Sequence, residues 1–382
     1  MNIVKGVVGG RVLLADGEIA IAELAIQEGN ISAVGGAVGK ALDATGLLVL
    51  PGLVDIHGDA FERQLAPRPE VRFPIDMALH DTDRQLLANG ITTAFHGITC
   101  SWEGGLRGLD MARELVRHLA LGRGLAADNR VHLRFENHHL DAVDEVLEWI
   151  DEGWVDFLAF NDHLPAMLRR VNESERMNKF AERSGLSVER FRELLLRTAE
   201  QTGQMPATVA KLAAQAARCG LAMASHDDMT RADRERYQRL GCAIAEFPMR
   251  VEAAVAAKDF DNDVIMGAPN VVRGGSHLGG VSATQMVAEG ICTVLASDYF
   301  YPAMLPAPFR LAASGASKLA DAWKLVSRNP ARMAGLADRG EIAVGQRADL
   351  VLVDDSRPGF PVVVATLVGG VPCYLSRSLS WH

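Results

Sequence analysis

The chain has 382 residues, with 39 Lys and Arg against 48 Asp and Glu, which gives a formal net charge of −9. This acidic balance argues against a protein that binds nucleic acid or an anionic membrane through bulk charge. The hydrophobic content of 48% is ample for a packed core and argues against disorder. No apolar run approaches the roughly 18 residues of a membrane helix, and no cleavage site follows the N-terminal segment, so a signal peptide is not expected.

The five cysteines are scattered along the chain and never form a CxxC pair. This pattern is typical of small core residues in a reducing compartment, not of a disulfide framework. We therefore expect a cytoplasmic protein without a membrane or nucleic-acid partner, either monomeric or a homo-oligomer.

The two ends of the chain share a β-rich texture. Short apolar runs separated by Gly, Pro or Asp occur at Ile3–Val8, Arg11–Leu14, Ile19–Ile26, Asn30–Val34, Glu341–Val344, Leu350–Val353, Val362–Leu367 and Val371–Leu375. Such runs are typical of strands joined by tight turns. The sequence therefore predicts one small β-sandwich domain built from residues 1–49 and 340–382.

The middle of the chain alternates apolar strands with helices. The predicted strands are Leu48–Ile56, Ile91–Phe95, Val131–Phe135, Val155–Phe160, Leu221–Ser225, Ala243–Phe247, Val264–Gly267 and Val294–Ser297. The predicted helices are Pro206–Cys219, one that begins at the capping box Ser282–Gln285 and ends at Gly290, and Ser317–Arg328, which we expect to stop at Asn329-Pro330. Eight such units predict a (β/α)8 barrel of the TIM type over residues 50–339, with a helical excursion at 165–203.

Imidazole and carboxylate side chains follow most of the predicted strands, where a barrel places its active site. The HxD pair His57 and Asp59 would lie on one side of a strand as a chelating pair. The other candidate metal ligands are Glu136, His163, His226 and Asp298, whereas Glu246 is left undecided. These ligand types suit one or two divalent ions, most readily zinc, with manganese or iron open. Bound ions would activate a water molecule, and Asp298 would accept its proton or complete the ligand set.

Two basic segments predict contacts with an anionic substrate. The Gly-rich stretch after the seventh predicted strand contains Asn270, Arg273 and His277, and it resembles an anion cradle. Arg68 lies on a Pro-containing loop after the HxD pair, and Arg134 shares a strand face with Glu136. A solvated loop remains the alternative for Arg68.

Longer motifs resemble a known family across the whole chain. "LPGLVDIHGD" and "NPARMAGLADRGEIAVGQRADLVLVD" are similar to segments of the amidohydrolase superfamily. Within it, "ASHDD" and "MGAPNVVRGGSH" most resemble the diphosphatases of the carbon–phosphorus lyase route of phosphonate degradation. The resemblance implies metal-dependent hydrolysis of a ribose 1-methylphosphonate 5-triphosphate between its α and β phosphorus atoms. Arg68, Arg273 and His277 would then neutralise the departing pyrophosphate.

The chain departs from the wider superfamily in its ligands. His57-x-Asp59 replaces the common HxH motif, and Glu246 stands where many members have His. No Lys occupies the position of the carbamylated lysine that would bridge two metal ions, so Glu136 is the better candidate for a bridging ligand. Two other functions remain open on the sequence. One is an amidohydrolase acting on a cyclic amide or an N-acyl substrate, and the other is a barrel that serves as a non-catalytic scaffold.

Overall fold

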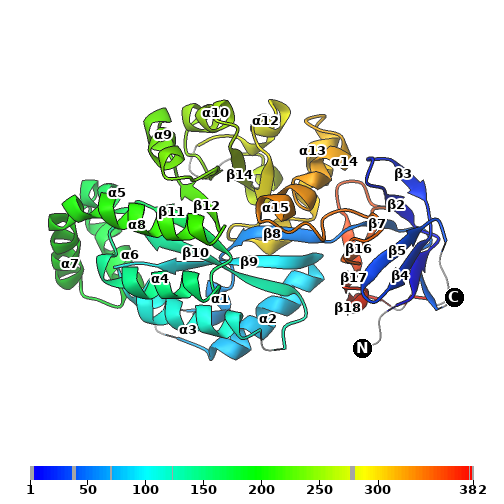
Figure 1. Ribbon diagram of the computed structural model, residues 1–382, viewed down its shortest axis with the longest axis horizontal. Coiled ribbons are helices and arrows are strands. Elements are labelled where there is room, and N and C mark those ends of the chain that lie inside the picture. The colour runs from blue at the N-terminus through cyan, green and yellow to red at the C-terminus, as the bar shows by residue number, and fades with distance from the viewer. Residues whose placement is uncertain are drawn as a thin grey trace.

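The computed structural model describes residues 4–36, 40–68, 71–122, 124–275, 280–377 and 379–380. At its centre is a parallel eight-stranded sheet in which each strand pairs with the next one along the chain (Figure 1). Its strands are β8 (Leu53–Gly58), β9 (Ile91–Cys100), β10 (Asp128–Glu136), β11 (Phe157–Asn161), β12 (Ala222–His226), β13 (Ile244–Glu246), β14 (Asp263–Gly267) and β15 (Val294–Ala296). Most of their residues are buried, as expected for strands covered on both faces.

The first and last of these strands meet and close the sheet. The Asp298 N–H donates to the His57 carbonyl at 2.9 Å, and the Asp59 N–H donates to the Asp298 carbonyl at 3.0 Å. The buried carboxylate of Asp55 accepts hydrogen bonds from the Ser297 N–H at 2.9 Å and the Ser297 hydroxyl at 2.5 Å. These bonds make a barrel of the predicted TIM type, and they bring the residues after β8 and β15 together.

Helices connect the barrel strands. In chain order they are α1 (Glu62–Leu65), α2 (Ile75–Ala88), α3 (Leu109–Ala120), α4 (Val143–Asp151), α5 (Leu164–Arg169), α6 (Ser174–Ser184), α7 (Val188–Glu200), α8 (Met205–Arg218), α9 (Arg231–Arg239), α10 (Val251–Asp259), α11 (Ala268–Arg273), α12 (Ala283–Ala288), α13 (Pro306–Ala313), α14 (Leu319–Lys324) and α15 (Arg328–Met333). Short 3₁₀ turns occur at Gly105–Arg107, Leu140–Ala142, Thr202–Gln204 and Tyr301–Ala303. Within the described residues no helix is long and apolar enough to cross a bilayer.

Two further sheets lie beside the barrel, at the end opposite to α6 and α7 (Figure 1). Their strands are β1 (Gly6–Val8), β2 (Arg11–Leu13), β3 (Ile19–Ile21), β4 (Leu24–Gln27), β5 (Asn30–Val34), β6 (Ala41–Asp43), β7 (Leu48–Pro51), β16 (Leu350–Asp354), β17 (Val362–Val368) and β18 (Val371–Leu375). One sheet has the order β5-β4-β1-β6 and the other β18-β17-β16-β7-β2-β3. The second sheet joins strands from both ends of the chain, as predicted, whereas the boundaries at residues 49 and 340 stay a prediction.

Four local predictions were wrong. The run Ile19–Ile26 forms two strands, because β3 belongs to the six-stranded sheet and β4 to the four-stranded sheet. The run Leu48–Ile56 forms two strands, because Gly52 separates β7 in the outer sheet from β8 in the barrel. A Cβ on Gly52 would lie 2.3 Å from the Thr92 Oγ1 atom, so only glycine allows this close approach. Residues 341–344 form no strand, and the helix predicted at 317–328 ends at Lys324. Asn329-Pro330 lies in the first turn of α15, where a missing N–H costs no helical hydrogen bond.

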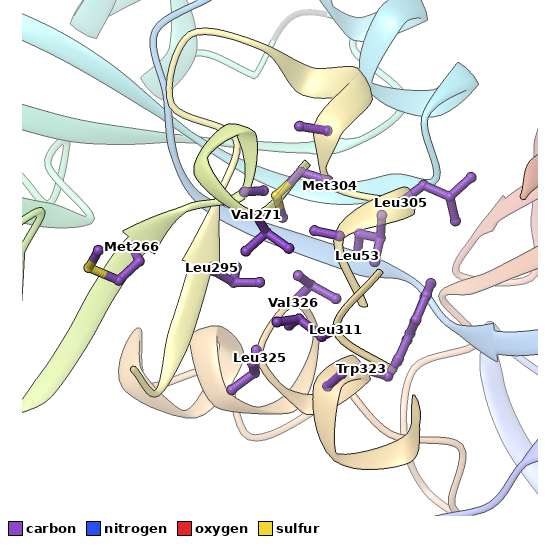
Figure 2. Packing of buried hydrophobic residues seen from close by; sticks show 14 of the residues in the cluster. Leu53, Met266, Val271, Leu295, Met304, Leu305, Leu311, Trp323, Leu325 and Val326 are labelled. Atoms are coloured by element: carbon purple, nitrogen blue, oxygen red, sulfur yellow. The ribbon is translucent and has the colours of Figure 1, made fainter. Parts of the chain in front are cut away.

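One apolar cluster joins the barrel wall to the six-stranded sheet. Leu53, Leu295 and Trp323 pack in it with residues of α11 and α13, as Figure 2 shows. The same cluster includes Leu50 of β7 and Val351 of β16, and the Trp323 Nε1–H donates to the Pro51 carbonyl at 3.1 Å. The core is therefore continuous across the connection between the two parts of the fold.

Candidate metal centre

The most buried part of the candidate site is the pair His57 and Glu246. His57 lies on β8 and Glu246 ends β13, and both side chains are almost inaccessible to solvent. The His57 Nδ1 atom lies 2.7 Å from the Glu246 Oε1 atom. Burial lowers the pKa of His57 to about 4 in spite of this carboxylate, so the imidazole is neutral at neutral pH. With its proton on Nδ1 toward Glu246, His57 presents a free lone pair on Nε2.

His226 shares the same carboxylate from the end of β12. Its Nδ1 atom lies 2.8 Å from the Glu246 Oε2 atom, and its ring stacks on that of His57 with a centroid distance of 5.6 Å. On the opposite side, the Arg134 guanidinium donates from Nη2 to the His226 Nε2 atom at 3.1 Å and from Nη1 to the Asp59 Oδ2 atom at 3.3 Å. Arg134 therefore lies within the group of candidate ligands.

Glu136 and His163 form a second pair at the neighbouring strand ends. The Glu136 carboxylate, which ends β10, contacts the His163 Nδ1 atom directly and accepts from the His163 N–H at 3.4 Å. Burial alone would raise the pKa of Glu136, but the charge and hydrogen bonds of His163 hold it at about 2. The Glu136 carboxylate in turn raises the pKa of His163 to about 10. The His163 Nε2 atom lies 3.5 Å from the Asp227 Oδ2 atom.

Asp298 lies where the barrel closes. Its backbone has φ 55°, a left-handed conformation that Asp and Asn adopt more readily than most residues. Burial, with the negative charge of Asp59 as the next cause, raises the pKa of the Asp298 carboxyl to about 7. This carboxyl group is therefore suited to exchange a proton near neutral pH.

One cleft at this end of the barrel contains most of the predicted site. Its lining includes His57, Arg134, His226, Asn270, Arg273 and Asp298. The Arg273 guanidinium donates to the Tyr299 hydroxyl at 3.3 Å at the rim. The Asn270 amide is used by the backbone, since Nδ2 donates to the Val281 carbonyl and Oδ1 accepts from the Ala283 N–H. Asn270 thus fixes the chain after the Gly-rich stretch.

The structure does not bring every predicted residue into this cleft. Arg68 is exposed and does not line it, whereas the nearby Arg63 contacts the Tyr299 carbonyl. His277 lies outside the described residues. Glu136 and His163 line an adjoining cavity that shares Arg134 and His226 with the cleft.

The side chains present fit a divalent metal. Among the described residues, two groups of three place their ligand atoms within 4.8 Å of one another: His57, His226 and Glu246, and His163, His226 and Asp227. Imidazole and carboxylate are the donors that zinc, manganese and iron accept. The Glu246 contacts to two Nδ1 atoms also match the way outer carboxylates orient histidine ligands. A metal bound at the His226 Nε2 atom would displace the Arg134 guanidinium.

Sequence reasoning left Glu246 undecided and did not select Asp227. Asp227 directly follows His226 and has φ 62°, which turns its carboxylate back toward His163. The motif "SHDD" contains Asp227 and could have indicated it as a candidate. The motif does not show the left-handed backbone that directs the carboxylate toward His163. Glu246 was visible as the last residue of a short strand, whereas its two histidine partners depend on the barrel geometry.

Comparison with known proteins decides the family. The chain is 33% identical over 353 residues to the alpha-D-ribose 1-methylphosphonate 5-triphosphate diphosphatase of Escherichia coli (strain K12), covering 89% of this chain and 93% of that protein. The profile of the Amidohydrolase family also matches residues 192–374. The chain belongs to the amidohydrolases. The family resemblance seen in the motifs is thereby confirmed.

Solved amidohydrolase structures share the fold of the whole chain. The dihydropyrimidinase from Brevibacillus agri NCHU1002 aligns with a TM-score of 0.61 and 14% identity over 99% of this chain and 96% of that one. N-acetylglucosamine-6-phosphate deacetylase from Pasteurella multocida gives 0.63 and 12% over 96% and 98%. An adenosine deaminase from Xanthomonas campestris, solved with bound zinc, gives 0.60 and 14% over 99% and 94%. At these identities the likeness concerns the fold of the amidohydrolase barrel.

Proposed function

We propose that this amidohydrolase is a metal-dependent diphosphatase that hydrolyses alpha-D-ribose 1-methylphosphonate 5-triphosphate to the 5-phosphate and pyrophosphate. The observation that carries the proposal is a single cleft in which two imidazoles oriented by Glu246 and a carboxyl group of raised pKa lie beside two arginines: His57, His226, Asp298, Arg134 and Arg273. The named relative from Escherichia coli supports the substrate assignment.

The metal would be held by His57, Asp59, Glu136, His163, His226 and Asp298, with Asp227 as a further candidate. A divalent ion, most readily zinc, lowers the pKa of bound water and offsets negative charge on a phosphate. Glu246 accepts from the Nδ1 atoms of His57 and His226 and so favours the tautomer whose Nε2 atom can act as a ligand. Asp298 accepts the proton of the attacking water, because its raised pKa lies near neutral pH.

The arginines of the cleft bind the polyphosphate. We assign the leaving pyrophosphate to Arg273 at the rim of the cleft, and the phosphate at the scissile bond to Arg134, which also lines it. A planar guanidinium can hold two phosphate oxygens at once and stabilise the charge that develops on the leaving group. Arg68 and His277 remain further candidates for this contact. The scattered cysteines, which form no CxxC pair, support the cytoplasm as the place of the reaction.

Phosphorus NMR of the purified enzyme with the ribose triphosphate and added zinc, manganese or iron tests the proposal. We expect pyrophosphate to appear together with the 5-phosphate, and addition of a chelator to stop the reaction. Stepwise release of orthophosphate, or no release with any of the three metals, would contradict it. Hydrolysis of a cyclic amide or N-acyl substrate under the same conditions would point to an amidase instead.

A further inference from the structure

A second cavity adjoins the candidate metal centre on the side of the helical excursion. Its lining includes Thr99, Glu103, Arg107, Arg170, Phe180 and Arg183, and we call it the α5–α6 cavity. It also shares Arg134, His226 and Asp227 with the cleft that contains Arg273. A substrate whose scissile bond lies at the shared residues would therefore extend into both spaces.

The walls of the α5–α6 cavity carry little free positive charge. Arg107 donates to both oxygens of Glu62 at 3.0 and 2.9 Å, and Arg183 is paired with the buried Glu103. Arg170 follows α5, and its guanidinium has no hydrogen-bond or ion-pair partner among the described residues. Because the other two charges are neutralised by carboxylates, the part of the chain that the structure describes offers this cavity a single free cation beyond the metal centre.

Three residues that line this cavity carry buried polar atoms without hydrogen-bond partners. Thr99 is only 7% exposed, and its Oγ1 atom has no hydrogen-bond partner. The Nε atoms of Arg134, which is 6% exposed, and of Arg183 are also buried and unpaired. Buried polar groups are almost always satisfied in folded proteins, so unpaired groups on a cavity wall indicate a polar ligand. The lining also includes the apolar side chains of Met167 and Phe180.

We propose that the α5–α6 cavity binds the ribose and its 1-methylphosphonate group, with Arg170 as the residue that recognises the phosphonate. This inference rests on the proposed function. A methylphosphonate ester carries one negative charge and a methyl group, which match one free guanidinium and the apolar side chains of the lining. The hydroxyl of Thr99 and the carboxylate of Glu103 suit the ribose hydroxyls. The triphosphate carries several negative charges, more than one free guanidinium offsets, so it extends toward Arg273 in the adjoining cleft.

The test compares two substrates, ribose 1-methylphosphonate 5-triphosphate and ribose 5-triphosphate, which lacks the phosphonate. For each enzyme we measure kcat/KM for pyrophosphate release from both substrates. The compared quantity is the value for the phosphonate-bearing substrate divided by the value for ribose 5-triphosphate. We expect Arg170→Ala to lower this ratio about tenfold or more, and Arg170→Lys to lower it less, because Lys keeps the charge but not the planar fork. Arg273→Ala is the matched control, since it should lower both kcat/KM values and leave the ratio unchanged.

The outcomes separate the two proposals. An unchanged ratio in Arg170→Ala, or a lowered ratio in Arg273→Ala alone, overturns the assignment of the cavity while the diphosphatase function stands. A parent enzyme that releases no pyrophosphate from either substrate overturns the function and the cavity assignment together. Arg170 is exposed at the end of a short helix, so its variants should fold, and their circular dichroism spectra should match that of the parent.

Discussion

The Nδ1 atom of His57 lies 2.7 Å from the Oε1 atom of Glu246, at the bottom of the candidate metal centre. Both side chains are fully enclosed, so the contact is not exchanged with water. Since Glu246 makes an equivalent contact with His226, one carboxylate sets the orientation of two candidate ligands.

Glu246→Gln should weaken metal binding about 10- to 100-fold, because the amide keeps the size of the side chain but removes the charge that orients both histidines. Elemental analysis after dialysis and a competition titration with a chromophoric chelator measure this loss. Glu193→Gln, on the exposed face of α7, is the control and should bind metal like the parent. If Glu246→Gln bound the metal as tightly as the parent enzyme, the Glu246 contacts would not orient the two histidines.

Asp298→Asn should reduce pyrophosphate release by about 10²–10⁴-fold while the fold is kept. Asparagine tolerates the left-handed backbone of this position, so the change removes the proton acceptor without adding strain. Asp261→Asn is a matched control, because Asp261 has φ 54° and lies exposed in the turn before β14. An Asp298→Asn enzyme with parental kcat would contradict the proposed role.

Arg234→Met should lower the free energy of unfolding by about 3–5 kcal/mol, because the buried carboxylate of Asp228 would lose its ion pair. The fully buried Arg234 guanidinium also donates to the Cys242 carbonyl at 2.9 Å and to the Asn262 Oδ1 atom at 2.6 Å. Urea unfolding followed by fluorescence measures the change. Arg239→Met, at the exposed end of the same helix, should cost less than about 0.5 kcal/mol.

His96 should make the protein less stable as the pH falls. Burial lowers the pKa of His96 below its ordinary value of 6.5, while its Nε2 atom contacts the Asn129 Oδ1 atom at 2.7 Å. Below pH 6.5 the unfolded chain therefore binds a proton that the folded chain excludes, and stability is lost by up to about 1.4 kcal/mol per pH unit. Above pH 6.5 this contribution is fully present.

The measurement compares parent and His96→Gln in urea at several pH values between about 7 and about 5. Both proteins are first stripped of metal, so that metal release does not add to the slope. The glutamine amide can keep the contact with Asn129 but does not titrate, so its stability should fall less steeply. Parallel curves would exclude a contribution from His96.

The barrel could be predicted because its strands are short apolar runs that alternate with helical segments. β14 and β10 lie within a few residues of their predicted positions, and the candidate ligand Glu136 is the last residue of β10. The single strand predicted across Gly52 was wrong, since the sequence does not show that β7 and β8 belong to different sheets. Pro330 was misread for a similar reason, because a proline in a first turn resembles one that ends the preceding helix.

The candidate site was predictable in composition and less so in its contacts. His57, His226 and Asp298 could be selected because they follow strands of a barrel, and the structure places them in one cleft. Which imidazole nitrogen faces Glu246 depends on side-chain rotamers and on the register of β13, which a single sequence does not encode locally. The exposed position of Arg68 depends on the path of its loop.

The continuous core across Gly52 has a consequence for how the protein can be divided. Leu50 of the outer sheet and Leu53 of the barrel belong to one apolar cluster, and only Gly52 separates β7 from β8. Removal of the first 50 residues would expose the partner surface of β16 and the barrel wall beneath Trp323. The terminal sheets therefore support β8, the strand that carries His57, through shared packing. A barrel expressed without these sheets would lack that packing.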